Sequence, residues 1–114
     1  MQNHFLYLAW TNPMNGRKYV VGKLTCDCNY KFEYCYDNEA IEAGWQPLVA
    51  FPERKVYESE FLFPVFSSRI PDRKRRDIQK ILNKYGLKEF DELELLRKSG
   101  ARLPVDTYEF LDSN

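Results

Sequence analysis

The chain has 114 residues, a length typical of one domain with a single modest core. Its 17 basic and 17 acidic residues cancel to a formal net charge of zero, which excludes a whole-molecule field that would draw the protein to nucleic acid or to a membrane. The hydrophobic fraction of 44% and the aromatic fraction of 16% exclude a disordered tail and predict one folded domain over residues 1–114.

The sequence carries no signal for membrane insertion or secretion. No apolar run approaches the roughly 20 residues of a membrane span, and the N-terminal MQNHFLYLAW lacks the positive leader and cleavage site of a signal peptide. Of the three cysteines, Cys26 and Cys28 are separated by one residue, a spacing that fits neither a redox pair nor a zinc knuckle. Free thiols and a cytoplasmic location are therefore expected.

Two strands joined by a tight turn are predicted at the start of the chain. Residues 4–11 are apolar on both faces of an extended chain, so this strand should be central in a sheet or covered on both sides. Asn-Pro and Asn-Gly turn signals follow within residues 12–16, and residues 19–24 complete the hairpin. Gly22 inside the second strand predicts a bulge or a close backbone approach.

A third strand is predicted over residues 30–36, where aromatic and other side chains alternate. One face carries Tyr30, Phe32, Tyr34 and Tyr36. This face should lie in the core and the opposite face in water. A short helix over residues 38–43 should follow, capped by Asp37 or Asn38 and ended by Gly44.

Residues 45–55 should be extended, because Pro47 and Pro52 disfavour a helix. Helix signals dominate the chain beyond them. Ser59 is a candidate N-cap for a helical segment over residues 61–68, whose aromatic side chains are predicted to be core: Phe61, Phe63 and Phe66.

Two longer helices and a closing strand are predicted next. The first helix begins near Pro71, ends at Gly86 and carries an apolar stripe of Ile78, Ile81, Leu82 and Tyr85. The second covers residues 89–98 and ends at Gly100. Residues 105–111 form the last strand. The order predicts an α+β fold: a small antiparallel sheet, made of the hairpin, the third strand and the C-terminal strand, packed against about three helices.

No catalytic motif is present in the sequence. It contains no glycine-rich phosphate loop, no nucleophile elbow and no kinase signature set. The lone histidine, His4, is predicted to be a surface residue, and Cys26, Cys28 and Cys35 are not spaced as metal ligands. We therefore predict no catalytic residue, no metal site and no cofactor, and expect that the chain is not an enzyme.

The basic run Arg73-Lys74-Arg75-Arg76 is the sharpest functional signal. Cations in the first turn of a helix oppose its dipole, so helix stability does not explain them. They form either a solvated face paired with Asp72 and Asp77, or a contact with an acidic protein surface, or a contact with phosphates. Trp45, in an irregular stretch, is either core cover or an interface anchor.

The order of several short motifs resembles the N-terminal subdomain of HipA-type toxin kinases. The chain shows VGKL over residues 21–24, YKFEY over 30–34, QPLVAFP over 46–52 and LFPVFSSRIPD over 62–72. It departs from the family pattern at Arg73, where relatives often have glycine after Pro-Asp, and near Val105, where a second Gly-Ala is missing. The likeness covers nearly the whole chain.

The resemblance implies an α+β accessory module without the kinase lobes. Stand-alone versions of this subdomain, the small protein of tripartite toxin–antitoxin systems, bind and restrain a separate kinase, so a HipA-like kinase is the expected partner. The expected contact residues are Trp45, Phe51, Arg69, Arg73, Arg75 and Arg76. Similar modules precede a HIRAN domain, a DNA-end-binding fold, which implies the alternative of a nucleic-acid-associated role. No membrane contact is expected.

Overall fold

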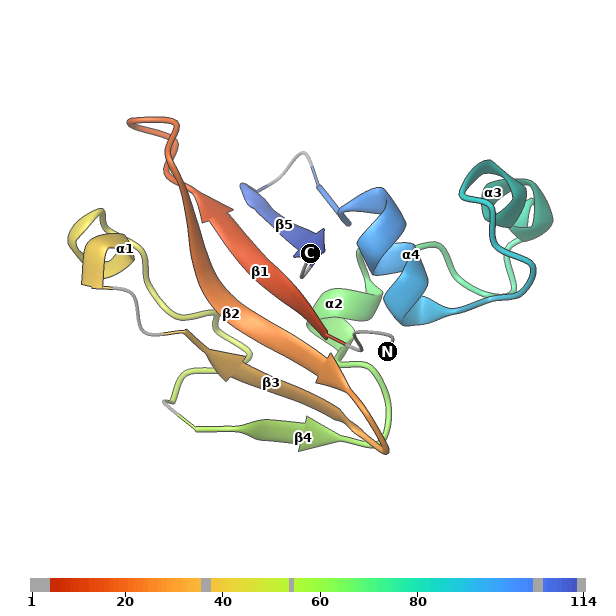
Figure 1. The fold of residues 1–114 in the computed structure, drawn as a ribbon, viewed down its shortest axis with the longest axis horizontal. Helices are drawn as coiled ribbons and strands as arrows, with labels where there is room; N and C mark the ends of the chain where they lie inside the picture. Colours follow the sequence, from red (N-terminus) through yellow and green to blue (C-terminus); the bar gives the residue numbers. More distant parts are fainter. Residues whose placement is uncertain (1–4, 36–37, 54, 104–105, 113–114) are drawn as a thin grey trace.

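An antiparallel sheet runs through the centre of the molecule (Figure 1). The computed structural model describes residues 5–35, 38–53, 55–103 and 106–112. Within these residues the sheet has the order β4-β3-β2-β1-β5, and its strands are β1 (Phe5–Thr11), β2 (Lys18–Cys26), β3 (Tyr30–Tyr34), β4 (Tyr57–Ser59) and β5 (Tyr108–Asp112). The helices of the described residues are α1 (Asn38–Glu42), α2 (Pro64–Ser67), α3 (Ile78–Lys84) and α4 (Glu92–Ser99). The predicted α+β class is confirmed.

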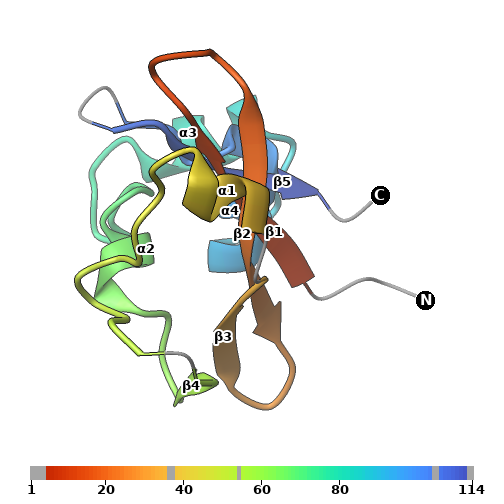
Figure 2. The same ribbon diagram turned by 90° about the vertical axis from the view of Figure 1, so that its left-hand side faces the viewer.

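One face of the sheet carries the core. Figure 2 shows α2 and the chain between α1 and β4 on one side of the strands. The strand side chains that pack in the core include Leu6, Leu8 and Leu24, all buried. The opposite face carries half-buried Phe5 and Tyr7 from β1 and exposed charges from β3. Helix α3 lies at one end of the molecule, beyond α4 as seen from the sheet (Figure 1).

The predicted hairpin and third strand are confirmed. Strand β1 pairs with β2 on one edge and β5 on the other, the interior position in the sheet that the sequence offers as one of two alternatives. In β3, Phe32 and Tyr34 are buried and Lys31 is exposed, as the alternation predicts, whereas Tyr36 lies outside the described residues. Strand β4 was not predicted, because its sequence YES has no apolar alternation; it pairs with the free edge of β3.

Gly22 makes room for the fully buried ring of Phe32. A Cβ atom at this position would lie 2.6 Å from two ring carbons of Phe32. The register of β1 and β2 shifts between Leu8 and Ala9, next to the pairing of Leu8 with Gly22. The predicted irregularity and close approach are therefore both found, although the approaching group is a side chain and not a backbone.

Replacing Gly22 with alanine should destabilise the fold, because the added methyl group collides with a ring that is fully buried. We expect the free energy of unfolding to fall by about 1–3 kcal/mol, as in other overpacked cores. Urea denaturation of Gly22→Ala measures the loss, and the double variant Gly22→Ala/Phe32→Leu should recover part of it. An unchanged midpoint for the single variant would contradict the steric argument.

Aromatic rings form the centre of the core. The ring of Phe32 lies 4.6 Å from that of Phe51 and 5.3 Å from that of Phe66, and Phe63 packs edge-on against Phe51 at 5.1 Å. The prediction that Phe61 belongs to this cluster is wrong, because its side chain is 74% exposed. Phe61 precedes α2 in a non-helical bend, so helical spacing from Phe63 and Phe66 does not apply to it.

Three helices begin later than predicted. Helix α4 starts at Glu92, although the prediction begins at residue 89. Helix α2 starts at Pro64, which occupies its first turn, and Ser59 lies in β4 instead of capping a helix. Helix α3 starts at Ile78 and not near Pro71. Only Leu82 of its apolar stripe is fully buried, because α3 lies at the periphery of the fold.

The predicted helix ends are confirmed by their caps. Gly86 has a φ of +72° after α3, and the amide of Leu87 donates to the carbonyl of Leu82 at 2.8 Å, which closes a Schellman motif. Helix α4 is capped by Asp91, whose side chain accepts from the amide of Glu94, and ends at Gly100. The short helix before Gly44 is also found, whereas Asp37 lies outside the described residues.

The predicted closing strand begins later than the sequence pattern indicates. Strand β5 starts at Tyr108, although the prediction begins at residue 105, and residues 104 and 105 lie outside the described part. Its pairing with β1 places Phe110 opposite Leu8. Phe110 is buried against the ring of Phe66 at 5.0 Å, so the C-terminal strand also closes the core.

Candidate functional site

Two of the six predicted contact residues belong to the core. Trp45 is buried, and its Nε1 donates to the hydroxyl of Tyr108 at 2.9 Å. Phe51 is buried among the aromatic rings. The structure therefore favours the core-cover alternative for Trp45 and leaves neither ring on the surface.

The loop that contains these two residues is tied to the sheet. The hydroxyl of Tyr34 donates to the carbonyl of Phe51 at 2.7 Å and accepts from the amide of Leu48 at 2.9 Å. Val49, between these anchor points, is 97% exposed. The loop is thus a fixed feature that leaves the side chain of Val49 in solvent.

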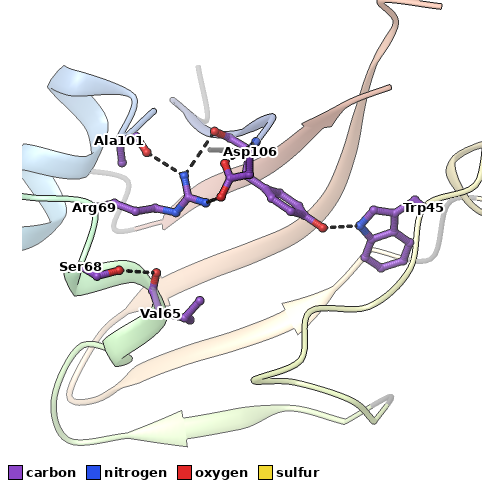
Figure 3. Close-up of polar contacts among 7 residues, drawn as sticks. Trp45, Val65, Ser68, Arg69, Ala101 and Asp106 are labelled. Atoms are coloured by element: carbon purple, nitrogen blue, oxygen red, sulfur yellow. Dashed lines mark hydrogen bonds and ion pairs between the residues drawn. The ribbon is translucent and has the colours of Figure 1, made fainter. Parts of the chain in front are cut away.

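Arg69, the third predicted contact residue, is a structural clamp (Figure 3). Its side chain is only 6% exposed and forms an ion pair with Asp106. Its Nη1 donates to the carbonyls of Ala101 at 3.0 Å and Tyr108 at 3.4 Å. Arg69 thereby joins the chain after α2 to the chain after α4 and to the start of β5. The forked guanidinium suits this role because it can serve several acceptors at once.

Removing the Arg69 side chain should lower the free energy of unfolding far more than removing the side chain of an exposed arginine. Arg69→Ala leaves the partly buried Asp106 and two carbonyls without their donor, and we expect a loss of about 3 kcal/mol in the free energy of unfolding. Arg75→Ala is the matched control, because its pair with Asp77 is exposed and should contribute less than about 1 kcal/mol. Equal urea midpoints for the two variants would contradict the clamp.

The other three predicted residues lie together on an exposed turn. Residues 72–77, which we call the basic turn, precede α3, and all four of their cationic side chains are exposed. The Asp72 side chain accepts from the amide of Lys74 at 2.8 Å and shapes the turn, and Arg75 pairs with Asp77. The prediction that the cations occupy the first turn of a helix is wrong, because α3 begins at Ile78, after them.

A cavity of about 610 Å³ lies beside the basic turn. We call it the Phe61 groove; it is lined by Phe61, Ser67, Ser68, Ile70, Pro71, Asp72, Arg73, Phe90 and Glu92. The guanidinium of Arg73 lies 4.9 Å from the centre of the Phe90 ring. Sequence reasoning identified Arg73 but missed the groove, because no local pattern relates Phe90 to Arg73 or turns Phe61 outward.

Among the described residues, no group of three or more His, Cys, Asp and Glu side chains is placed to hold a metal ion. The thiols of Cys26, Cys28 and Cys35 are free. His4 lies outside the described part. In the same part of the chain, no helix is long and apolar enough to cross a membrane.

A buried carboxylate on β5 carries two ion pairs. The side chain of Glu109 is 8% exposed and pairs with Lys18 and, at 2.5 Å, with Arg102. Burial by itself raises the pKa of Glu109, but the hydrogen bonds and charges of Lys18 and Arg102 outweigh it, so the pKa lies below its ordinary value. The ion pairs link β5 to β2, on the far side of β1, and to the loop after α4.

The stability that Glu109 contributes should depend on pH. Because its pKa is lower in the folded state than in the unfolded chain, the contribution is complete above the unfolded pKa and disappears as the pH falls through the folded pKa. Thermal melts of the wild type and Glu109→Gln should therefore differ at pH 7 and converge towards pH 3. A constant difference across this range would show that Glu109 does not titrate with folding.

The family model described as "HipA N-terminal domain" matches residues 14–104 of the chain. This range covers most of the 114 residues and includes Arg69, the basic turn and the Phe61 groove. Searches of the curated proteins and of the solved structures find no match to the chain.

Proposed function

The chain belongs to the family of HipA N-terminal domains, and we propose on this premise that it is a non-catalytic regulatory module that docks on a HipA-like serine/threonine kinase and restrains it. Family membership associates the chain with the HipA toxin system and is the observation that carries the proposal. The docking partner and the restraint are inferences from that association and from the exposed surface of the domain.

The basic turn supports a docking role. Arg73, Arg75 and Arg76 are exposed in a turn where they are not needed to stabilise a helix. A cationic surface of this kind steers an acidic partner and selects its orientation. Restraint needs no chemistry from this chain, because phosphoryl transfer depends on the closure and alignment of the kinase, which a bound module can obstruct.

The proposal is tested by co-expressing the tagged chain with a HipA-like kinase from the same genome and measuring co-purification and autophosphorylation. We expect the kinase to be retained and its activity to fall. Arg75→Glu/Arg76→Glu should weaken binding at least about tenfold, mainly through a slower, salt-sensitive association rate. The control Lys88→Glu/Lys98→Glu makes the same charge change at exposed positions outside the basic turn and should bind normally. If no kinase is retained or inhibited, the proposed function is wrong.

A nucleic-acid-associated role is the second candidate, and the position of Phe61 favours it. An exposed aromatic ring beside cations is the pattern of single-strand binding sites. In this case labelled oligonucleotides should bind with an affinity that falls steeply with salt and drops on Arg75→Ala/Arg76→Ala. Salt-independent or undetectable binding would exclude this candidate.

A further inference from the structure

The Phe61 groove combines an apolar surface with one held cation. Its lining comes from three places in the chain: the bend before α2, the segment from the end of α2 to the basic turn, and the start of α4. The two tertiary anchors of this region are the buried Phe66 in α2 and the Arg69 clamp. The groove is therefore built on fixed elements.

The apolar part of the groove is Phe61 with its neighbours. Phe61 is 74% exposed, whereas Phe90, Ile70 and Pro71 are half-buried. Removing a phenylalanine side chain from water stabilises by roughly 1.5–3 kcal/mol. Because Phe61 stays in solvent, the fold itself gains little of this stabilisation there. An exposed aromatic ring at the mouth of a cavity is typical of an anchor point for a partner side chain.

The cationic part is Arg73. Its guanidinium is held over the Phe90 ring, and among the described residues none accepts a hydrogen bond from it or pairs with it. The two carboxylates of the lining, by contrast, already have donors: Asp72 accepts from the amide of Lys74, and Glu92 accepts from the hydroxyl of Tyr30 at 3.5 Å. Arg73 therefore presents a positioned set of N–H donors to whatever enters the groove.

We propose that the Phe61 groove binds a short extended segment of a partner polypeptide, with one apolar side chain against Phe61 and Phe90 and one carboxylate on Arg73. A volume of about 610 Å³ accommodates several side chains, more than a single ion needs. A carboxylate forms two parallel hydrogen bonds with a guanidinium. Asp72 and Glu92 in the same lining favour one acidic side chain over a chain of phosphates, which they would repel. The inference rests on the proposed function in that the segment would belong to the kinase.

The probe is an array of short peptides that place Asp or Glu one to three positions from Phe, Leu, Ile or Val. The tightest binder is then fluorescein-labelled and titrated by anisotropy against the whole chain. Replacing its acid with Lys, or its apolar residue with Ser, should each weaken binding about tenfold or more. If no peptide of the array binds, or if the Lys version binds as well, the inference is overturned.

Variants of the chain locate the binding site. Phe61→Ser and Arg73→Gln should each reduce peptide affinity about tenfold, with unchanged circular dichroism because both side chains are exposed. Val49→Ser and Arg76→Gln are matched controls, since each removes the same kind of exposed group outside the groove lining. Equal losses in the controls, or none in the groove variants, would overturn the proposal.

Two further measurements decide between occupants. Single-stranded DNA that displaces the labelled peptide from the wild type, and that when labelled itself no longer binds Phe61→Ser, would reassign the groove to nucleic acid and overturn the proposal. A dimer in sedimentation velocity that dissociates on the same substitution would reassign it to a second copy of the chain. A monomer with no DNA competition supports a peptide occupant.

The kinase experiment separates this inference from the proposed function. If the Phe61→Ser and Arg73→Gln variants still retain and inhibit the kinase like the wild type, the groove does not bind a segment of the kinase, and the docking function stands. If the wild type retains no kinase but binds the peptide in the groove, the docking function fails and the groove stands as a site for another polypeptide.

Discussion

The packing of the Phe32 ring is the constraint on which the rest of the fold depends. The ring fits because Gly22 on the neighbouring strand has no side chain, and it contacts Phe51 from the loop and Phe66 from α2. Phe66 in turn packs against Phe110 of β5 at 5.0 Å. One chain of ring contacts thus joins the sheet, the loop, the helical layer and the last strand, so α2 has a defined position on the sheet despite its four residues.

The position of α2 determines what the following segment can do. Arg69, just beyond α2, is drawn inward to Asp106 and to the carbonyls near β5. The chain then leaves the core at Pro71 and returns to it in α4, where Leu93, Leu95 and Leu96 are buried. The basic turn lies between these two fixed points, which allows its cations to stay in solvent without weakening the core. Scaffold and candidate contact surface are thus neighbours in the sequence but separate in space.

The same separation explains the Phe61 groove. Leu62, Phe63 and Phe66 fill the space beneath α2, which leaves Phe61 directed away from the core. Phe90, in the chain just before α4, lies under the guanidinium of Arg73. A surface assembled in this way loses little conformational entropy when a partner binds, because its backbone is already ordered. This property suits a module whose proposed role is to hold another protein in one state.

Local patterns determined much of this protein. Strand alternation at Tyr30–Tyr34, the turn before β2, the glycine caps at Gly86 and Gly100, and the irregularity at Gly22 all follow from short-range geometry and are found as predicted. The resemblance to the HipA N-terminal subdomain was recognised from the order of short motifs, which also needs no three-dimensional information. Such features depend on residues within a few positions of one another, so the sequence contains all that is required to recognise them.

Tertiary structure alone decided which of several similar residues are buried. Phe51 and Phe61 are both phenylalanines in non-helical segments, and Arg69 and Arg73 are both arginines near α2, yet one member of each pair is buried and the other is exposed. The difference comes from partners far along the chain: Phe32 for Phe51, and Asp106 for Arg69. Burial is a property of the assembled fold, because it depends on which distant elements meet. The sequence therefore identified the basic run but could not separate scaffold from contact surface.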